Sequence, residues 1–248
     1  MEEKKQNNGG VIAIVILSIL LILTSGYIVY EKMNVIKQER KNNNNSVIEN
    51  TKPVEIKVSE ETAKKLVDVN LNNYFNYERY LGLDKGVSFD NVVSALDWIL
   101  SQNVSKELKP IGNFCGSELE KTLISKKVIA RQNEGQYACD STDVYKLSDI
   151  KLKAKDYFKD SDKLDFTTLT TSTSSYYYES TTASIVVRVA GAQSVITKYV
   201  KHNVDGNILN ITFTSNEGAV NGVDATYTAS FDIVDNNYYI KSITKVNS

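Results

Sequence analysis

The first long hydrophobic stretch of the chain runs from residue 11 to residue 30 and contains no charged residue. In a helix, a stretch of this length spans about 30 Å, which is the thickness of the hydrocarbon core of a membrane. A helix also satisfies its own backbone polar groups in that environment. We therefore expect residues 11–30 to form a transmembrane helix and residues 1–10 to form a short cytoplasmic tail.

The flanks of this stretch leave two alternatives open. Lys4 and Lys5 before it and the small residues 24–26 within it are also features of a cleaved signal peptide, although the apolar run continues to Tyr30, which favours an uncleaved anchor. The positive-inside rule slightly favours a cytoplasmic C-terminal side, but long domains cross membranes largely regardless of charge. We expect a single-pass protein of the cell membrane with its C-terminal domain outside.

Beyond residue 30 the chain is expected to contain a polar segment and then one folded domain, whose first half has helical spacing. Residues 31–53 are polar, contain an asparagine run and end at a proline, so we expect a flexible tether. Residues 54–248 then form one extracytoplasmic domain that is helical over 59–158 and strand-rich over 176–246. Ser59, Ser88 or Asp90, Ser117 and Ser148 are the expected helix starts, and Ser117 with Glu120 forms a capping box.

The spacing changes to strict alternation in the second half. From Val223 to Ile233 every second residue is apolar, and residues 184–190, 194–202, 209–213 and 238–246 also read as strands. Gly or Asn pairs separate them, which predicts short turns and a sequential antiparallel meander. The fold class is therefore α+β, with helices packed on one face of a curved meander sheet. Over residues 148–248 this order resembles, in outline, cystatin-like and NTF2-like rolls.

Composition and charge exclude several functions. The 29 basic and 30 acidic residues nearly cancel, so the chain lacks the charge signature of a nucleic-acid-binding protein. One His and two Cys cannot make a four-ligand zinc finger or a CxxC redox pair, and no catalytic sequence motif is present. We expect neither an enzyme nor a cofactor or metal site. Only four basic residues are arginine, which indicates an AT-rich bacterial genome.

Four groups of residues are candidates for structure or function. Cys115 and Cys139 are predicted to form a disulfide if the domain lies outside the cytoplasm; two free thiols are the alternative. Tyr176, Tyr177 and Tyr178, set among Ser and Thr, are a possible recognition surface for a protein or a carbohydrate. His202 is expected to be a solvated residue at a strand end. The last group is a set of aspartates, Asp160, Asp162 and Asp165. They only faintly resemble a calcium-binding loop and are expected to be solvated.

These features favour a binding or interaction domain of a bacterial envelope protein, whose partner is another envelope protein, a cell-wall glycan or a small ligand. The alternative is a structural subunit of an envelope assembly of the secretion or conjugation kind. An unrecognised hydrolase that uses His202 or the acidic residues is a third, weaker hypothesis.

Overall fold

Ser59 begins the folded part of the chain, as predicted, by accepting a hydrogen bond from the amide of Thr62. The computed structural model describes residues 56–77, 86–112, 114–130, 139–170, 175–188, 194–220 and 223–246. Residues Glu55–Ser248 make one compact unit. The predicted tail, membrane helix and tether lie outside the described residues, and their boundaries remain predictions.

The helices follow the predicted order. The first is continuous through α2 (Glu60–Lys65), the π-helical turn η1 (Leu66–Leu71) and α3 (Asn72–Tyr77). The others are α4 (Val92–Ser101), α5 (Glu118–Ser125) and α6 (Leu147–Tyr157), with short 3-10 turns η3 (Asn103–Ser105), η5 (Cys139–Ser141), η6 (Ser161–Lys163) and η7 (Phe166–Thr168).

Two of the predicted helix starts are corrected. Asn91, rather than Ser88 or Asp90, caps α4, because its side chain reaches the amides of Val93 and Ser94. Lys146 precedes α6 without a side-chain cap, since the Ser148 hydroxyl bonds to Asp149 instead. Ser117 does cap α5, although the carboxylate of Glu120 accepts from the amide of Gly116 and so completes the capping box one residue early.

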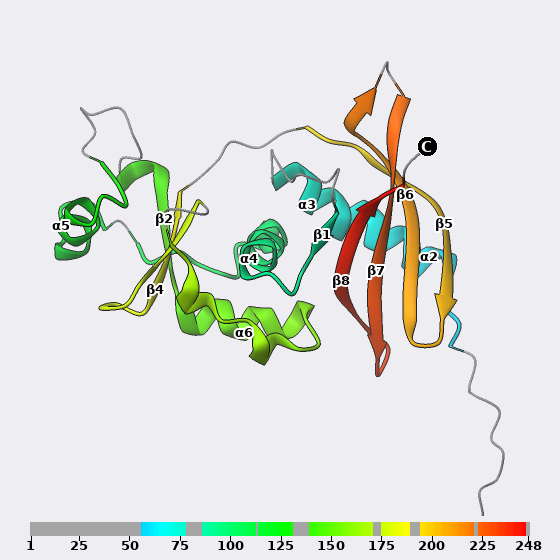
Figure 1. Cartoon of the computed structure of the whole chain (residues 1–248), viewed down its shortest axis with the longest axis horizontal. Coiled ribbons are helices and arrows are strands. Elements are labelled where there is room, and N and C mark those ends of the chain that lie inside the picture. The colour runs from blue at the N-terminus through cyan, green and yellow to red at the C-terminus, as the bar shows by residue number, and fades with distance from the viewer. Residues whose placement is uncertain are drawn as a thin grey trace, which may run out of the picture. The chain divides into compact units, whose positions relative to one another are not determined.

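Two antiparallel sheets accompany the helices (Figure 1). The larger sheet has the order β1-β8-β7-β6-β5, so β5 to β8 form the predicted meander. Its strands are β1 (Val87–Ser88), β5 (Thr197–Asp205), β6 (Ile208–Val220), β7 (Val223–Val234) and β8 (Asn237–Lys245). β1 adds an edge partner from far earlier in the chain, because Val87 and Ser88 pair with Ile243 and Ser242.

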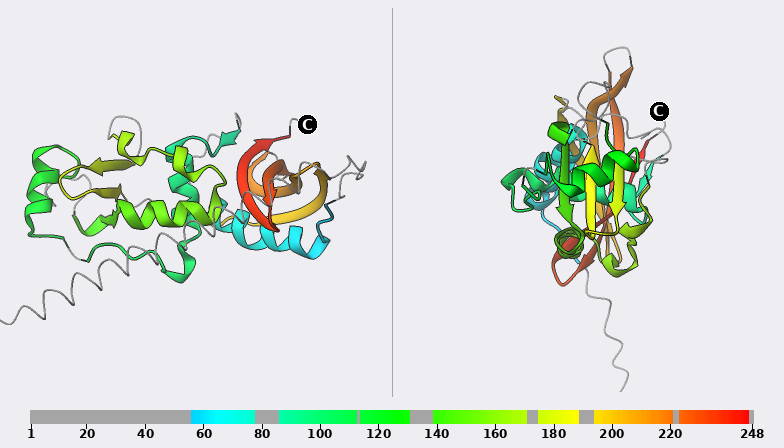
Figure 2. Two further views of the ribbon diagram at one scale, coloured as in Figure 1. Left: turned by 90° about the horizontal axis from the view of Figure 1, so that it is seen from below. Right: turned by 90° about the vertical axis from the view of Figure 1, so that its left-hand side faces the viewer.

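The alternation in β7 divides the larger sheet into two faces. Its inward residues, from Ala225 to Ile233, are buried. Val223 at the start of the strand is 70% exposed, so the prediction that it faces the core is wrong. On the inner face, Phe75 of α3 packs edge-on against Phe213 and Tyr227. Figure 2 shows the first helix along one side of the curved sheet. The outer face carries cross-strand rows of polar residues, such as Thr212, Thr228 and Thr244.

The smaller sheet was not predicted and corrects the expected single meander. It has the order β2-β4-β3, with β2 (Thr142–Lys146), β3 (Tyr176–Glu179) and β4 (Ser184–Arg188). β4 corresponds to residues 184–190, which we expected to form a strand of the meander. Its residues Ile185 and Val187 join the main core, and Val186 joins a smaller core, so both of its faces are buried. A strand covered on both faces has a continuous apolar run rather than alternation.

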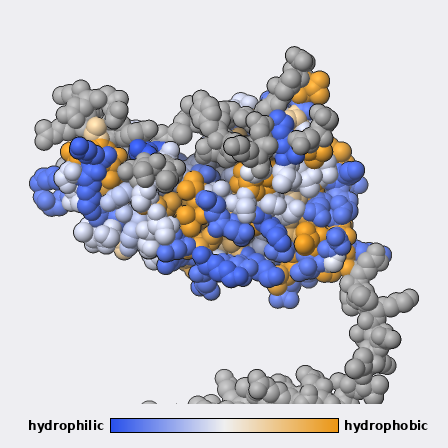
Figure 3. Space-filling model, in the orientation of Figure 1, coloured by the Kyte–Doolittle hydropathy of each residue, from blue (hydrophilic) through white to orange (hydrophobic). Residues whose placement is uncertain are grey.

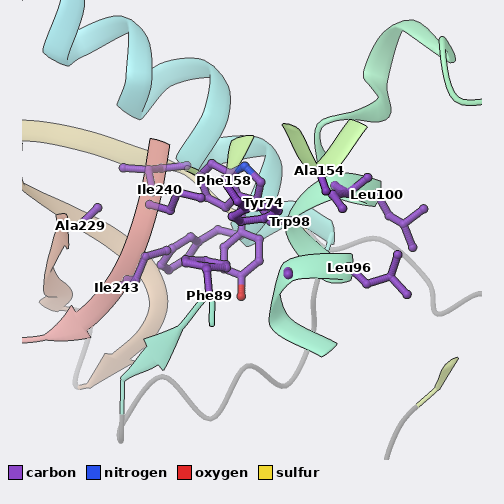
Figure 4. Packing of buried hydrophobic residues seen from close by; sticks show 14 of the residues in the cluster. Tyr74, Phe89, Leu96, Trp98, Leu100, Ala154, Phe158, Ala229, Ile240 and Ile243 are labelled. Atoms are coloured by element: carbon purple, nitrogen blue, oxygen red, sulfur yellow. The ribbon is translucent and has the colours of Figure 1, made fainter. Parts of the chain in front are cut away.

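The main core lies where α4 and α6 pack between the two sheets (Figure 1). Aromatic rings fill its centre. Trp98 of α4 contacts Tyr74 at 5.3 Å and Phe89 at 5.2 Å between ring centroids, and all three side chains are at most 3% exposed (Figure 4). On the face drawn in Figure 3, hydrophobic residues form only small separate patches among hydrophilic ones. The described surface there is therefore mostly polar.

Candidate functional site

A cavity of about 530 Å³ opens beside β8, near the end of α6. Three separate segments form it: residues 89–90 between β1 and α4, residues 158–164 from the end of α6 through η6, and the β7–β8 hairpin. The volume lies within the range of small-ligand sites, about 300–1,000 Å³. We take this cavity as the candidate binding site.

The floor of the cavity is apolar and belongs to the main core. Phe89, Phe158, Leu164 and Ile240 line it and are each at most 6% exposed. The rings of Phe89 and Phe158 are stacked at 6.2 Å, and Figure 4 shows them beside Trp98 and Ile240. Because these side chains are held by dense packing on their far side, the floor exists before any ligand arrives.

The rim of the cavity carries charges of both signs. Its residues are Asp90, Asp160, Asp232, Lys159, Lys163 and Lys241. Asp160 and Lys163 form an ion pair at 3.3 Å in which both side chains are more than half exposed. Such an exposed pair contributes little to stability, so a ligand can replace it at low cost. The described lining includes no Ser, Cys or His.

The three predicted recognition tyrosines form β3 but lie in different surroundings. Tyr176 is 4% exposed and its hydroxyl donates to the carboxylate of the buried Asp97, so it belongs to the core rather than to an exposed surface. Tyr177 packs against the smaller core and Tyr178 against the main core, and both are half-buried. The described lining of the cavity includes none of them. Recognition by Tyr177 and Tyr178 stays a prediction.

A buried carboxylate follows these tyrosines. Glu179 has no exposed side-chain area, and its carboxylate accepts from the Lys126 ammonium at 2.8 and 2.9 Å and from the amide and hydroxyl of Thr181. Burial by itself raises the pKa of Glu179, but the hydrogen bonds from Lys126 and Thr181 outweigh burial and lower it. Lys126 is the C-cap residue of α5, so this pair joins α5 to the β3–β4 turn. Its role is structural.

Cys115 and Cys139 lie at disulfide distance, with their Cα atoms 5.6 Å apart, which confirms the predicted pairing. The two residues bracket α5. Beneath that helix lies the smaller core, whose buried members are Phe114, Leu123, Val128, Ile129, Val144 and Val186. The disulfide therefore closes the segment that covers this core.

His202 is not the solvated strand-end residue that we expected. It is half-buried, lies within β5 and points inward opposite Ile211. Its Nε2 donates to the carbonyl of Val58 at 3.0 Å, because a carbonyl can only accept. In the neutral ring Nδ1 then accepts from the Tyr199 hydroxyl at 2.7 Å. His202 thus fastens the entry of the folded domain to β5, and its inward place in the strand alternation could have indicated this.

The three aspartates of the faint calcium loop do not form one group. Asp160 lines the cavity, and Asp162 is exposed. Asp165 caps η7 by accepting from the hydroxyl and the amide of Thr167, and these bonds lower its pKa. Within the part of the chain that the structure describes, no three His, Cys, Asp or Glu residues are grouped so as to hold a metal ion.

Comparisons of the chain with protein families, with curated proteins and with solved structures give no match. No helix among the described ranges combines the length and the hydropathy of a membrane span. The predicted span, residues 11–30, lies outside those ranges.

Proposed function

We propose that the chain is a membrane-anchored binding protein of a bacterial envelope, with its α+β domain outside the membrane and its ligand in the cavity beside β8. The observation that carries this proposal is the cavity itself, a packed apolar floor beneath a rim of mixed charge. Small-ligand sites combine apolar surface with polar groups that fix the orientation of the ligand, and in this cavity the charged lining residues outnumber the apolar ones, six to four.

Two further features support the location. The uncharged run of residues 11–30 has the length of a membrane anchor. The disulfide between Cys115 and Cys139 is of a kind that persists outside a reducing cytoplasm. The order of elements expected over residues 148–248 resembles, in outline, cystatin-like and NTF2-like rolls. That outline is also the basis of the alternative, a structural subunit of an envelope assembly, which predicts recovery of the chain in a complex of fixed stoichiometry.

The location is tested with the two cysteines as reporters. Intact cells that express the full chain are treated with a membrane-impermeant maleimide, with and without prior reduction. Labelling only after reduction is expected for a disulfide on the outer side. Labelling that needs cell lysis but no reduction would mean a cytoplasmic domain and would refute the proposal.

Binding in the cavity is tested with a matched pair of charge-swapped variants. Asp160→Lys with Lys163→Glu reverses an exposed ion pair on the rim, whereas Glu118→Lys with Lys121→Glu reverses a comparable pair on α5. A library of small charged and apolar fragments is screened by ligand-observed NMR against the full chain in nanodiscs. Fragments should bind the chain and the α5 variant equally and the rim variant several-fold more weakly. Equal binding to all three would exclude the cavity as the site.

A further inference from the structure

The edge of β8 beside the cavity lacks a strand partner among the described residues. β1 pairs only with Ile243 and Ser242, and one more bond joins the amide of Phe89 to the carbonyl of Lys241. The chain then turns away into α4, which Asn91 caps. Residues Asn237–Ile240, which we call the open edge of β8, therefore continue past the end of β1 with β7 as their only described strand neighbour.

The turn that leads into β8 determines which backbone groups face this open edge. Asp235 and Asn236, with φ of 50° and 62°, form a two-residue turn, and Val234 and Asn237 close it as the first pair. In such a hairpin the closing pair exchanges hydrogen bonds, and the pairs then alternate. The N–H and C=O groups of Tyr238 and Ile240 therefore point away from β7, toward the position of a further strand.

A bulge lies on the same edge, at the residues of β8 that line the cavity. The pairing of β7 with β8 shifts between Ser230 and Phe231, which pair with Ser242 and Ile240, so Lys241 is the extra residue. Ile240 and Lys241 line the cavity, together with Lys163 and Leu164 of the segment that follows α6. Bulges are frequent at sheet edges beside functional sites, because they re-aim side chains. A segment that continued the line of β1 would lie in the cavity.

We infer that the ligand of the cavity is an extended peptide segment of another protein, which adds as a strand to the open edge of β8 and places an apolar side chain on the floor of Phe89, Phe158 and Leu164. This inference rests on the proposed function of the cavity. Strand addition supplies partners for the backbone groups of Tyr238 and Ile240, and the alternate side chains give specificity. A compact apolar ligand would fill the floor but leave those groups to water.

The charges of the rim favour a peptide that carries both signs. Three carboxylates and three ammonium groups surround the floor, so neither a polyanion nor a polycation is favoured as a whole. A lipid phosphate or a nucleic acid would meet Asp90, Asp160 and Asp232 as well as the lysines. A peptide with an apolar residue between an acidic and a basic one places each charge near its opposite.

The test uses random peptides of about six residues, the length of an ordinary strand, displayed on phage and selected on the full chain in nanodiscs. Selected peptides are synthesised in unmodified form and in two forms N-methylated at alternate residues. Binding is followed by the fluorescence of Trp98, the single tryptophan, whose ring lies 5.2 Å from Phe89. Only one of the two methylation patterns removes the N–H groups that face β8.

Peptides with an apolar residue flanked by both charges should be enriched, and one methylation pattern should weaken their binding at least tenfold while the other leaves it unchanged. The rim charge swap should weaken binding, and the α5 swap should not. Equal tolerance of both methylation patterns would overturn strand addition. Absence of enriched peptides while small fragments still bind would overturn the peptide as ligand but keep the proposed site. If neither fragments nor peptides bind, both proposals fail.

Discussion

Removal of the disulfide should destabilise one part of the domain far more than the rest. Cys115 and Cys139 are 24 positions apart, and a cross-link over a loop of this length stabilises by about 3.5 kcal/mol in the chain-entropy model. The closed segment contains α5, whose Leu123 is fully buried in the smaller core. That core has few buried members, so it depends on the cross-link more than the main core does.

The perturbation is the double variant Cys115→Ala with Cys139→Ala, compared with the natural chain in its oxidised and reduced forms. Native-state hydrogen exchange measures the effect for each element. If the smaller core opens locally, amides in α5 should exchange about a few hundredfold faster, which is the factor that corresponds to about 3.5 kcal/mol. Amides in β6 and β7 should keep their protection, since they belong to the main core. The reduced natural chain should match the double variant.

Two results would refute this reasoning. Equal loss of protection in α5 and in β6 would mean that the domain opens as a single cooperative unit. Unchanged protection in α5 would mean that the packing of Leu123 and the Lys126–Glu179 pair hold the helix without the cross-link.

Three further predictions concern single side chains. Asn76→Ala should lower the free energy of unfolding, measured with urea, by about 1–3 kcal/mol, because Asn76 makes two hydrogen bonds to the backbone of Val195. Asn203→Ala, at an exposed position, is the control and should change this free energy little. Tyr176→Phe should cost a similar amount by removing the donor to Asp97, with Tyr239→Phe, at a half-buried tyrosine of β8, as the control. The pKa of Glu179 is lowered in the folded protein, so its ionised form stabilises the fold above about pH 4.3. This contribution is lost as the pH falls through the folded pKa. Glu179→Gln should therefore flatten the acid side of the profile of stability against pH, measured by urea denaturation.

Local patterns predicted the elements better than their partners. The alternation of residues 223–233 and the caps at Ser59 and Ser117 specify a strand and two helix starts from neighbouring residues alone. The run Ile185–Val187 also predicts a strand, but nothing in it selects a sheet, because a strand buried on both faces has no polar side. β2 was missed since its five residues are too few to establish a period.

The candidate site could not be predicted from the sequence, for a related reason. Asp90, Asp160 and Asp232 come from three distant segments, and only the fold brings them to one rim. One local signal was present: a charged residue directly follows a core aromatic at Phe89-Asp90 and again at Phe158-Lys159. Such a pair places a charge at the border of the core. It does not indicate that two borders will meet.

The pairing of β1 with β8 has a consequence for the synthesis of the protein. Val87 is made early, but its partner Ile243 is made only when almost the whole domain has been translated. Until then the edge next to Phe89 has no neighbour, and the floor of the cavity lacks Ile240. Closure of so long a loop comes late in folding, because its entropy cost must be met before the contact forms. Ribosome-bound chains that stop short of β8 would thus lack the partner of β1, and a stop codon before Ile240 would remove this part of the cavity lining together with the sheet edge.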